Sequence, residues 1–250
     1  MEEHFELHTE QGTIRGMAHI PAPMPATRSA VVIAHGYFSA TRVGPARLYV
    51  HIARRLCESG CAAFRADLLG VGESDGFYKD ITFDSAVRDL SRVCGFVADA
   101  YKMSSIVLLG HSMGANLAMR VAISKKMVRK LVLVAPDVEK RDGVDHLFDE
   151  EQLSELERRG CTCRKGLHIN RSFVEEIRSR HPIIIAARVP CDIVVLQGDQ
   201  DELYDMNGAR QLAKAARGGK FVVIRGADHN FSDPSSRETL LREVVAEIVC

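Results

Sequence analysis

The sequence predicts an α/β protein in which a mostly parallel central sheet is covered by helices on both faces. Two observations carry this prediction. Short apolar runs alternate with segments of helical periodicity, and this alternation follows an initial hairpin pattern. Such apolar runs are typical of strands that are buried on both faces, as in parallel sheets. The 250 residues, of which 46% are hydrophobic, are sufficient for a large core.

The predicted elements follow one another in a regular order. The chain begins with a hairpin in which residues 5–8 and 13–20 flank a turn at Gln11 and Gly12. Six mainly apolar runs are predicted as buried strands, at residues 30–34, 61–66, 106–109, 131–136, 193–196 and 221–224. Helices are predicted at residues 46–58, 83–101 with Thr82 as N-cap, 115–122, 206–216 and 236–249.

The interval from residue 137 to 189 interrupts the alternation, because no strand is predicted there and charged residues are dense. Apolar residues at helical spacing predict two amphipathic helices, one with Leu147, Phe148, Leu153 and Leu156, the other with Phe173, Val174 and Ile177. We expect residues 137–189 to form a helical cap, and residues 1–136 and 190–250 to form one core domain. Ligands bind at the carboxyl edge of such sheets, so the cap is expected to cover the site.

The segment Gly110-His111-Ser112-Met113-Gly114 matches the G-x-S-x-G pattern, and a predicted strand and helix flank it as this motif requires. A serine at the tip of a tight turn leaves no room for side chains two positions away, which explains the two glycines. The turn also places Ser112 at a helix N-terminus, where free N–H groups and the helix dipole favour negative charge on oxygen. Ser112 is therefore the predicted nucleophile.

A second match to the same pattern, Gly72-Glu73-Ser74-Asp75-Gly76, serves as an internal control. No apolar run leads directly into it, and no helical pattern follows it. We therefore interpret Ser74 as a loop residue.

A serine hydroxyl needs a base, and the base needs an orienting acid. In a strand-turn-helix arrangement of this kind the three residues follow in the order Ser, Asp or Glu, His, each in a loop after a strand. His229 is the only histidine after the last predicted strand, so it is the predicted base. The acid is open at this point among three residues after the preceding strand, Asp199, Asp201 and Asp205.

Several segments together resemble the α/β-hydrolase superfamily: Gly110 to Gly114, Gly198-Asp199-Gln200-Asp201, Gly226-Ala227-Asp228-His229, His35-Gly36-Tyr37-Phe38 and the loop from Asp67 to Ser74. The resemblance covers the chain except for the cap and implies the α/β-hydrolase fold. The family's acid usually stands three residues after the glycine, which implies a triad of Ser112, Asp201 and His229, with Asp199 as the alternative acid. It further implies an oxyanion hole formed by the backbone N–H groups of Tyr37 and Met113.

Neighbouring polar residues are given structural roles. His35 is expected to hold the oxyanion loop, His111 to be a packed loop residue, and Asp228 to be a turn or surface residue. Within the superfamily, the chain looks most like cinnamoyl or feruloyl esterases and related small carboxylesterases. This resemblance implies an acyl-enzyme mechanism on small acyl or aromatic-acid esters, although only 6% of the residues are aromatic and none is Trp.

Other activities are compatible with the same triad. An acyl thioesterase would use it unchanged, and the basic residues Arg164, Lys165 and Arg171 of the cap could then hold the phosphates of an acyl-CoA. A serine peptidase or a cofactor-free haloperoxidase is less favoured, and a dehalogenase is disfavoured because the elbow carries serine rather than aspartate. A non-catalytic binding module on the same scaffold is a further alternative.

Composition excludes several classes of partner. The net charge is zero, so nothing in the overall charge attracts nucleic acid or an anionic membrane. The acidic start has no signal-peptide pattern, and no apolar run approaches the roughly 18 residues of a membrane span.

The odd number of cysteines, seven, favours reduced thiols and a cytoplasmic location. Cys161, Cys163 and His168 do not have a standard zinc spacing, so no metal and no cofactor is expected. A small-molecule ester is the expected partner, and a homodimer is left open.

Overall fold

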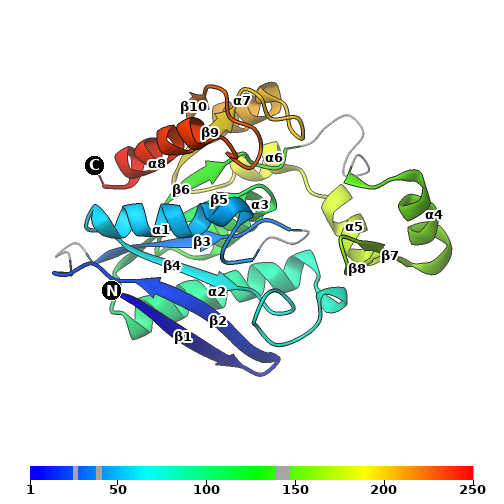
Figure 1. Ribbon diagram of the computed structural model, residues 1–250, viewed down its shortest axis with the longest axis horizontal. Helices are drawn as coiled ribbons and strands as arrows, with labels where there is room; N and C mark the ends of the chain where they lie inside the picture. The colour runs from blue at the N-terminus through cyan, green and yellow to red at the C-terminus, as the bar shows by residue number, and fades with distance from the viewer. Residues whose placement is uncertain (25–27, 38–40, 139–146, 250) are drawn as a thin grey trace.

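The computed structural model describes residues 1–24, 28–37, 41–138 and 147–249. Eight strands form one sheet in the order β1-β2-β4-β3-β5-β6-β9-β10, as Figure 1 shows. Their bounds are β1 Glu2–Thr9, β2 Gly12–His19, β3 Ser29–Ala34, β4 Ala62–Asp67, β5 Ser105–His111, β6 Val128–Val134, β9 Asp192–Gly198 and β10 Lys220–Ile224. β1 and β2 form the predicted hairpin, and β2 pairs antiparallel with β4. From β4 to β10 all pairings are parallel, which confirms the predicted α/β-hydrolase fold.

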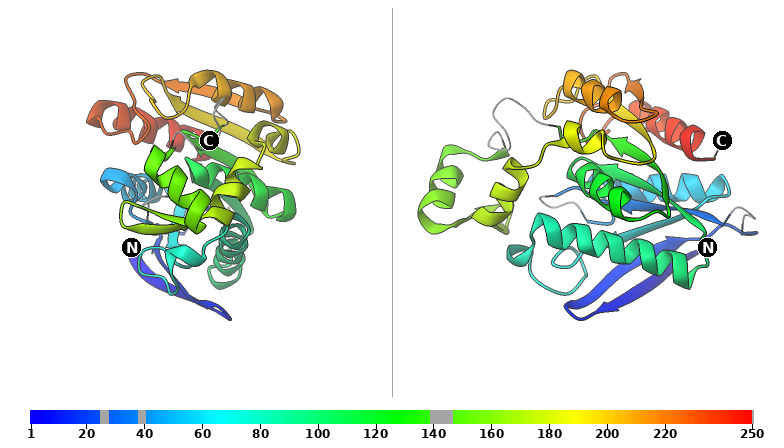
Figure 2. Two further views of the ribbon diagram at one scale, coloured as in Figure 1. Left: turned by 90° about the vertical axis from the view of Figure 1, so that its right-hand side faces the viewer. Right: turned by 180° about the vertical axis from the view of Figure 1, so that it is seen from behind.

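Helices cover both faces of this sheet because successive strand residues point to opposite sides (Figure 2). Val31 and Ile33 of β3 belong to the hydrophobic cluster that contains residues of α1 and α8, whereas Ala30 and Val32 belong to the cluster that contains residues of α2, α3 and α7. The bounds of these helices are α1 Leu48–Glu58, α2 Phe83–Ala100, α3 Met113–Ser124, α7 Met206–Ala215 and α8 Pro234–Val249, with 3-10 turns η1 Pro45–Arg47 and η2 Tyr78–Asp80. Thr82 caps α2 as predicted, accepting a hydrogen bond from the N–H of the third helical residue.

The interval after residue 146 contains three helices and a hairpin: α4 Glu150–Arg159, β7 Cys161–Arg164, β8 Leu167–Asn170, α5 Arg171–Arg178 and α6 Pro182–Ala186. In Figure 1, α4, α5 and the hairpin lie together at one end of the molecule, beyond the sheet. α6 packs against α3 and α7 of the core.

The expectation that this interval has no strand was wrong. β7 and β8 have four residues each, and in each strand only one residue is buried, Thr162 opposite Ile169. Such short strands with little buried surface leave no hydrophobic pattern. The first predicted amphipathic helix also begins later than expected, because Asp149 is its N-cap and Leu147 and Phe148 precede it. In the described part of the chain, no helix is both long and apolar enough to cross a bilayer.

Candidate active site

Ser112 lies at a tight turn between β5 and α3, with φ 56° and ψ −125°. This is a strained conformation for a residue other than glycine. A Cβ atom on Gly110 would lie 2.5 Å from the carbonyl oxygen of Gly114, and one on Gly114 would lie 2.2 Å from the carbonyl oxygen of Ala34. The steric reason inferred for the two glycines is therefore confirmed. Ser112 is the N-cap of α3, so its side chain stands at the positive end of that helix.

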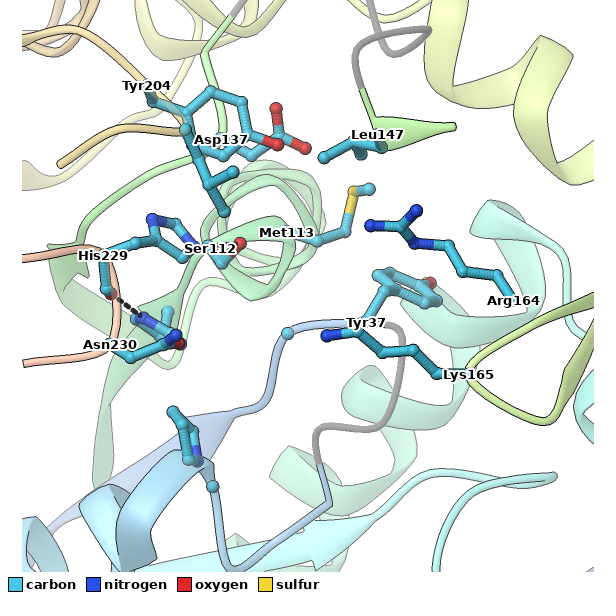
Figure 3. A pocket seen from close by; sticks show the side chains of 15 residues that line it. Tyr37, Ser112, Met113, Asp137, Leu147, Arg164, Lys165, Tyr204, His229 and Asn230 are labelled. Atoms are coloured by element: carbon cyan, nitrogen blue, oxygen red, sulfur yellow. Dashed lines mark hydrogen bonds between the residues drawn. The ribbon is translucent and has the colours of Figure 1, made fainter. Parts of the chain in front are cut away.

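The structure brings Ser112, His229 and Asp201 into one hydrogen-bonded chain. Figure 3 shows two members of this chain, Ser112 and His229, beside each other. The Ser112 Oγ lies 3.0 Å from His229 Nε2, and His229 Nδ1 lies 2.8 Å from Asp201 Oδ2. A carboxylate can only accept, so Nδ1 carries the proton and Nε2 is left to accept from the serine hydroxyl. The three side chains follow β5, β9 and β10, whose carboxyl ends meet at one edge of the sheet.

The carboxylate of Asp201 is held by donors besides His229. Its Oδ1 accepts from the N–H groups of Leu203 at 2.9 Å and Tyr204 at 3.0 Å, and its Oδ2 accepts from Gln197 Nε2 at 2.8 Å. Burial raises the pKa of Asp201, but the hydrogen bond and charge of His229, together with the Tyr204 and Gln197 bonds, outweigh it and lower the pKa below its usual value. Asp201 is therefore ionised at neutral pH.

The alternative acid, Asp199, has a different partner: its Oδ1 accepts from the N–H of Gly226 at 2.7 Å.

The hydrogen bond from Gln197 to Asp201 was not predicted from the sequence, although Gln197 is completely buried. A signal was present, because a polar residue directly follows the apolar run of β9. A buried amide at a strand end needs a partner, and Asp201 is that partner.

The loop after β3 approaches Ser112 closely. A Cβ atom on Gly36 would lie 3.3 Å from the Ser112 Cβ, so this position too favours glycine. The His35 ring holds the loop as predicted, since Nδ1 donates to the Gly36 carbonyl at 2.7 Å while Nε2 accepts from the Leu68 N–H at 3.3 Å. The peptide group is planar, so fixing the Gly36 carbonyl also fixes the direction of the Tyr37 N–H. The Tyr37 ring packs on Phe173 of α5, with ring centroids 4.7 Å apart.

His111 connects this loop with the loop of His229. The Gly36 N–H donates to the Tyr49 hydroxyl at 3.2 Å, this hydroxyl donates to His111 Nδ1 at 2.8 Å, and His111 Nε2 donates to the His229 carbonyl at 3.0 Å. The directions follow from the backbone groups at the two ends, because an N–H only donates and a carbonyl only accepts. Burial lowers the pKa of His111 to about 3, so the ring is neutral at physiological pH.

His111 is buried, as predicted, but its bridging role was not foreseen. Tyr49 was also missed, since a tyrosine on the apolar face of a predicted helix has no distinguishing pattern.

The other candidates from the sequence have structural positions. Ser74 lies in a loop, as predicted, where its hydroxyl donates to the Asp67 carbonyl at 2.6 Å. Asp228 stabilises a turn by accepting the backbone N–H four residues further on. Cys163 and His168 face each other in the β7–β8 pairing. Among the described residues, no group of three or more His, Cys, Asp or Glu side chains is arranged to hold a metal ion.

A cavity of about 320 Å³ opens beside Ser112 and His229. Its lining combines Tyr37, Met113 and Asp137, which lie close to Ser112, with Leu147, Arg164 and Lys165 from the interval after residue 146 (Figure 3). Asp137 forms an ion pair with Arg180, and the Asp137 N–H donates to the Ser112 carbonyl at 3.2 Å.

The fold and this arrangement of serine, histidine and aspartate define the class of α/β-hydrolases. The chain belongs to the family described as serine aminopeptidase, S33, whose family model matches residues 25–159. It is 30% identical to the monoacylglycerol lipase of Mycolicibacterium smegmatis over an alignment 278 residues long, which covers 95% of this chain and 94% of that protein. It is 25% identical over 200 residues to the mitochondrial palmitoyl-protein thioesterase ABHD10 of Pongo abelii; the match covers 74% of this chain and 63% of that protein.

Solved structures show the same fold. Est1E from Butyrivibrio proteoclasticus with bound ferulic acid has a TM-score of 0.84 at 20% identity, with 98% of each chain covered. The mouse alpha/beta hydrolase domain-containing protein 10 has a TM-score of 0.76 at 21% identity, covering 99% of this chain and 98% of that one. The predicted membership of the α/β-hydrolase superfamily is thus confirmed, and the chain is a serine hydrolase with lipase and thioesterase relatives.

Proposed function

We propose that the protein is a carboxylesterase that cleaves small acyl or aromatic-acid esters through an acyl-enzyme on Ser112. The observation that carries this proposal is the unbroken hydrogen-bonded chain from the Ser112 hydroxyl through His229 to the ionised Asp201, at the wall of a cavity. A serine hydroxyl becomes an effective nucleophile when a base accepts its proton and an acid orients that base.

In the first step the Ser112 Oγ attacks the ester carbonyl carbon while His229 Nε2 takes the serine proton. The carbonyl π electrons move to the oxygen, and the resulting oxyanion is bound by the N–H groups of Tyr37 and Met113. The intermediate then collapses, the bond to the alcohol oxygen breaks, and His229 returns its proton to that oxygen. In the second step His229 deprotonates a water that attacks the acyl-serine carbonyl carbon. The bond from this carbon to the Ser112 Oγ then breaks, His229 gives its proton to that Oγ, and the acid is released. Asp201 holds the ring in the required tautomer and stabilises the imidazolium.

Two features support the assigned oxyanion donors. Met113 is the first residue of α3, so its N–H has no acceptor within the helix. The Tyr37 N–H belongs to the peptide that His35 fixes, directly beside Ser112. Each such donor contributes about 10²–10³ to turnover.

The cavity also guides the choice of substrate. An aminopeptidase needs a carboxylate for the ammonium group of its substrate, but among the lining residues that the structure describes the carboxylate is Asp137, which is already paired with Arg180. This favours ester over peptide cleavage. The monoacylglycerol lipase and thioesterase relatives are acyl-group hydrolases by name, which agrees with that choice. An acyl thioesterase is the second candidate, because Arg164 and Lys165 line the cavity. In either reaction, residues 137–189 would act as the cap.

The direct test is labelling with a fluorophosphonate, which reacts with activated serines. We expect the wild type and Ser74→Ala to be labelled and Ser112→Ala to remain unlabelled. A folded but unlabelled wild type would instead indicate a binding module. A panel of substrates then distinguishes esterase, thioesterase and peptidase activity: p-nitrophenyl acetate, butyrate and octanoate, methyl ferulate, butyryl-CoA and an aminoacyl p-nitroanilide.

The six described cysteines are free thiols, which supports our placement of the protein in the cytoplasm.

A further inference from the structure

We propose that the β7–β8 hairpin forms an anion-binding subsite in the Ser112 cavity, so that the substrate is an ester or thioester carrying a carboxylate or phosphate. The inference rests on the proposed function, because it concerns the substrate of the same site. It starts from the juxtaposition of two cationic side chains with the serine nucleophile.

The tip of the hairpin delivers both cations. Arg164 is the last residue of β7, and Lys165 with Gly166 forms the turn to Leu167. Arg164 and Lys165 both line the cavity, and Figure 3 shows their charged ends pointing into it. The Arg164 guanidinium lies over the Phe148 ring at 5.7 Å from its centroid, which helps to fix its direction.

The residue type at the turn indicates a role beyond closing the hairpin. Lys165 has φ 49° and Gly166 has φ 77°, so both are left-handed, as in the two-residue turns that favour Asn-Gly. A lysine in this conformation costs about 1 kcal/mol more than glycine would. The sequence nevertheless places a long cation where it reaches the cavity.

The charges around the cavity leave room for an anion. Among the lining residues that the structure describes, the acid is Asp137, which forms an ion pair with Arg180; the side chain of Asp201 is 1% exposed and bound to His229. Lys165 has no ion-pair partner among the residues that the structure describes. Within a partly enclosed cavity, an attraction between opposite charges is stronger than in bulk water.

Arg171 provides a contrast. The sequence grouped it with Arg164 and Lys165 as a phosphate ligand, but it lies outside the described lining of this cavity and pairs with Glu175 at 2.7 Å. It is therefore a matched control: a cation of the same segment that does not face the site.

The test compares two fluorophosphonates of equal length, hexyl and 5-carboxypentyl, by the second-order rate constant for labelling Ser112. We expect the carboxylate probe to react about tenfold faster with the wild type, with a smaller ratio in 0.5 M NaCl because salt screens the attraction. Lys165→Asn removes the charge with a residue that tolerates the left-handed turn, and should lower the ratio about threefold. Arg164→Gln with Lys165→Asn should abolish the preference, Lys165→Arg should retain it, and Arg171→Gln should leave the ratio unchanged.

The outcomes separate the two proposals. If the neutral probe labels Ser112 but the carboxylate probe is no faster, or if the double variant keeps the wild-type ratio, the anion subsite is refuted and the serine hydrolase stands. If neither probe labels folded protein, the proposed function itself fails. Two substrates then locate the anion. 4-Nitrophenyl hemisuccinate carries its charge on the acyl group, and butyryl-CoA carries phosphates on the leaving group; kcat/KM for each is measured relative to 4-nitrophenyl butyrate. The substrate whose relative kcat/KM falls more in the double variant shows whether the anion lies on the acyl group or on the leaving group.

Discussion

Replacing Tyr49 by phenylalanine tests whether the hydrogen-bond chain through His111 positions the candidate site. Tyr49 is completely buried, and its hydroxyl joins the Gly36 N–H to His111 Nδ1. Tyr49→Phe would leave one donor and one acceptor buried without partners, each at about 1–3 kcal/mol. We therefore expect the free energy of unfolding to fall by about 3 kcal/mol, measured by urea unfolding at pH 7. The variant should still fold, since domains have roughly 5–15 kcal/mol of stability.

The activity of the same variant tests the positioning itself. Gly36 precedes the proposed oxyanion donor Tyr37, so a shift of this loop should lower kcat for p-nitrophenyl butyrate about tenfold. Tyr101→Phe is the matched control, because Tyr101 is half-buried and its hydroxyl bonds to Glu3 far from the site. It should cost less than about 1 kcal/mol and leave kcat unchanged. A Tyr49→Phe variant with wild-type kcat would refute the positioning argument, whatever its stability.

Three further predictions address the acid, the elbow and the buried histidine. Asp201→Asn should lower kcat by about 10⁴ through loss of the correct His229 tautomer, whereas Asp199→Asn should stay within a few-fold of wild type in the same ester assay. Gly114→Ala should lower the unfolding free energy by about 3 kcal/mol, because its Cβ would meet a backbone carbonyl of β3 at 2.2 Å; Gly95→Ala, with open space in α2, should instead raise it by about 0.5–1 kcal/mol. Because the pKa of His111 is about 3 in the folded protein and about 6.5 when unfolded, only the unfolded chain gains this proton between those values. Stability should therefore fall by about 3 kcal/mol between pH 6.5 and pH 4, and urea midpoints of His111→Gln should lack this part of the slope.

Much of the sheet could be predicted from the sequence, because its inner strands are buried on both faces. The run at 193–196 corresponds to β9, which the structure extends to Asp192–Gly198. Because the hydrogen-bonded ends of a strand extend beyond its apolar run, the bounds of the strands were predicted less accurately than their existence. The order of strands could not be read, since pairing joins segments that are distant in the chain. The β7–β8 hairpin escaped detection because it has four residues in each strand and a single buried pair.

The site was predictable to the extent that each residue follows a recognisable strand. Ser112 and His229 were selected by local context and chain order, but Asp201 and Asp199 both follow β9 and differ only in where the loop directs them. The structure distinguishes them, since only Asp201 is drawn inward by Gln197 and two backbone N–H groups. Tyr49 could not be found in this way, because its partner His111 is 62 residues away and nothing in α1 marks the hydroxyl.

The neutrality of the His111 network has a chemical consequence for the proposed mechanism. The rings of His111 and His229 have centroids 5.2 Å apart, so a charge on His111 would oppose the imidazolium that forms on His229. Burial suppresses that charge by lowering the pKa of His111, and the positive field of His229 lowers it further. The side chains whose hydrogen bonds join the two loops are therefore uncharged. Of the two adjacent rings, only His229 is then free to take up a proton during turnover.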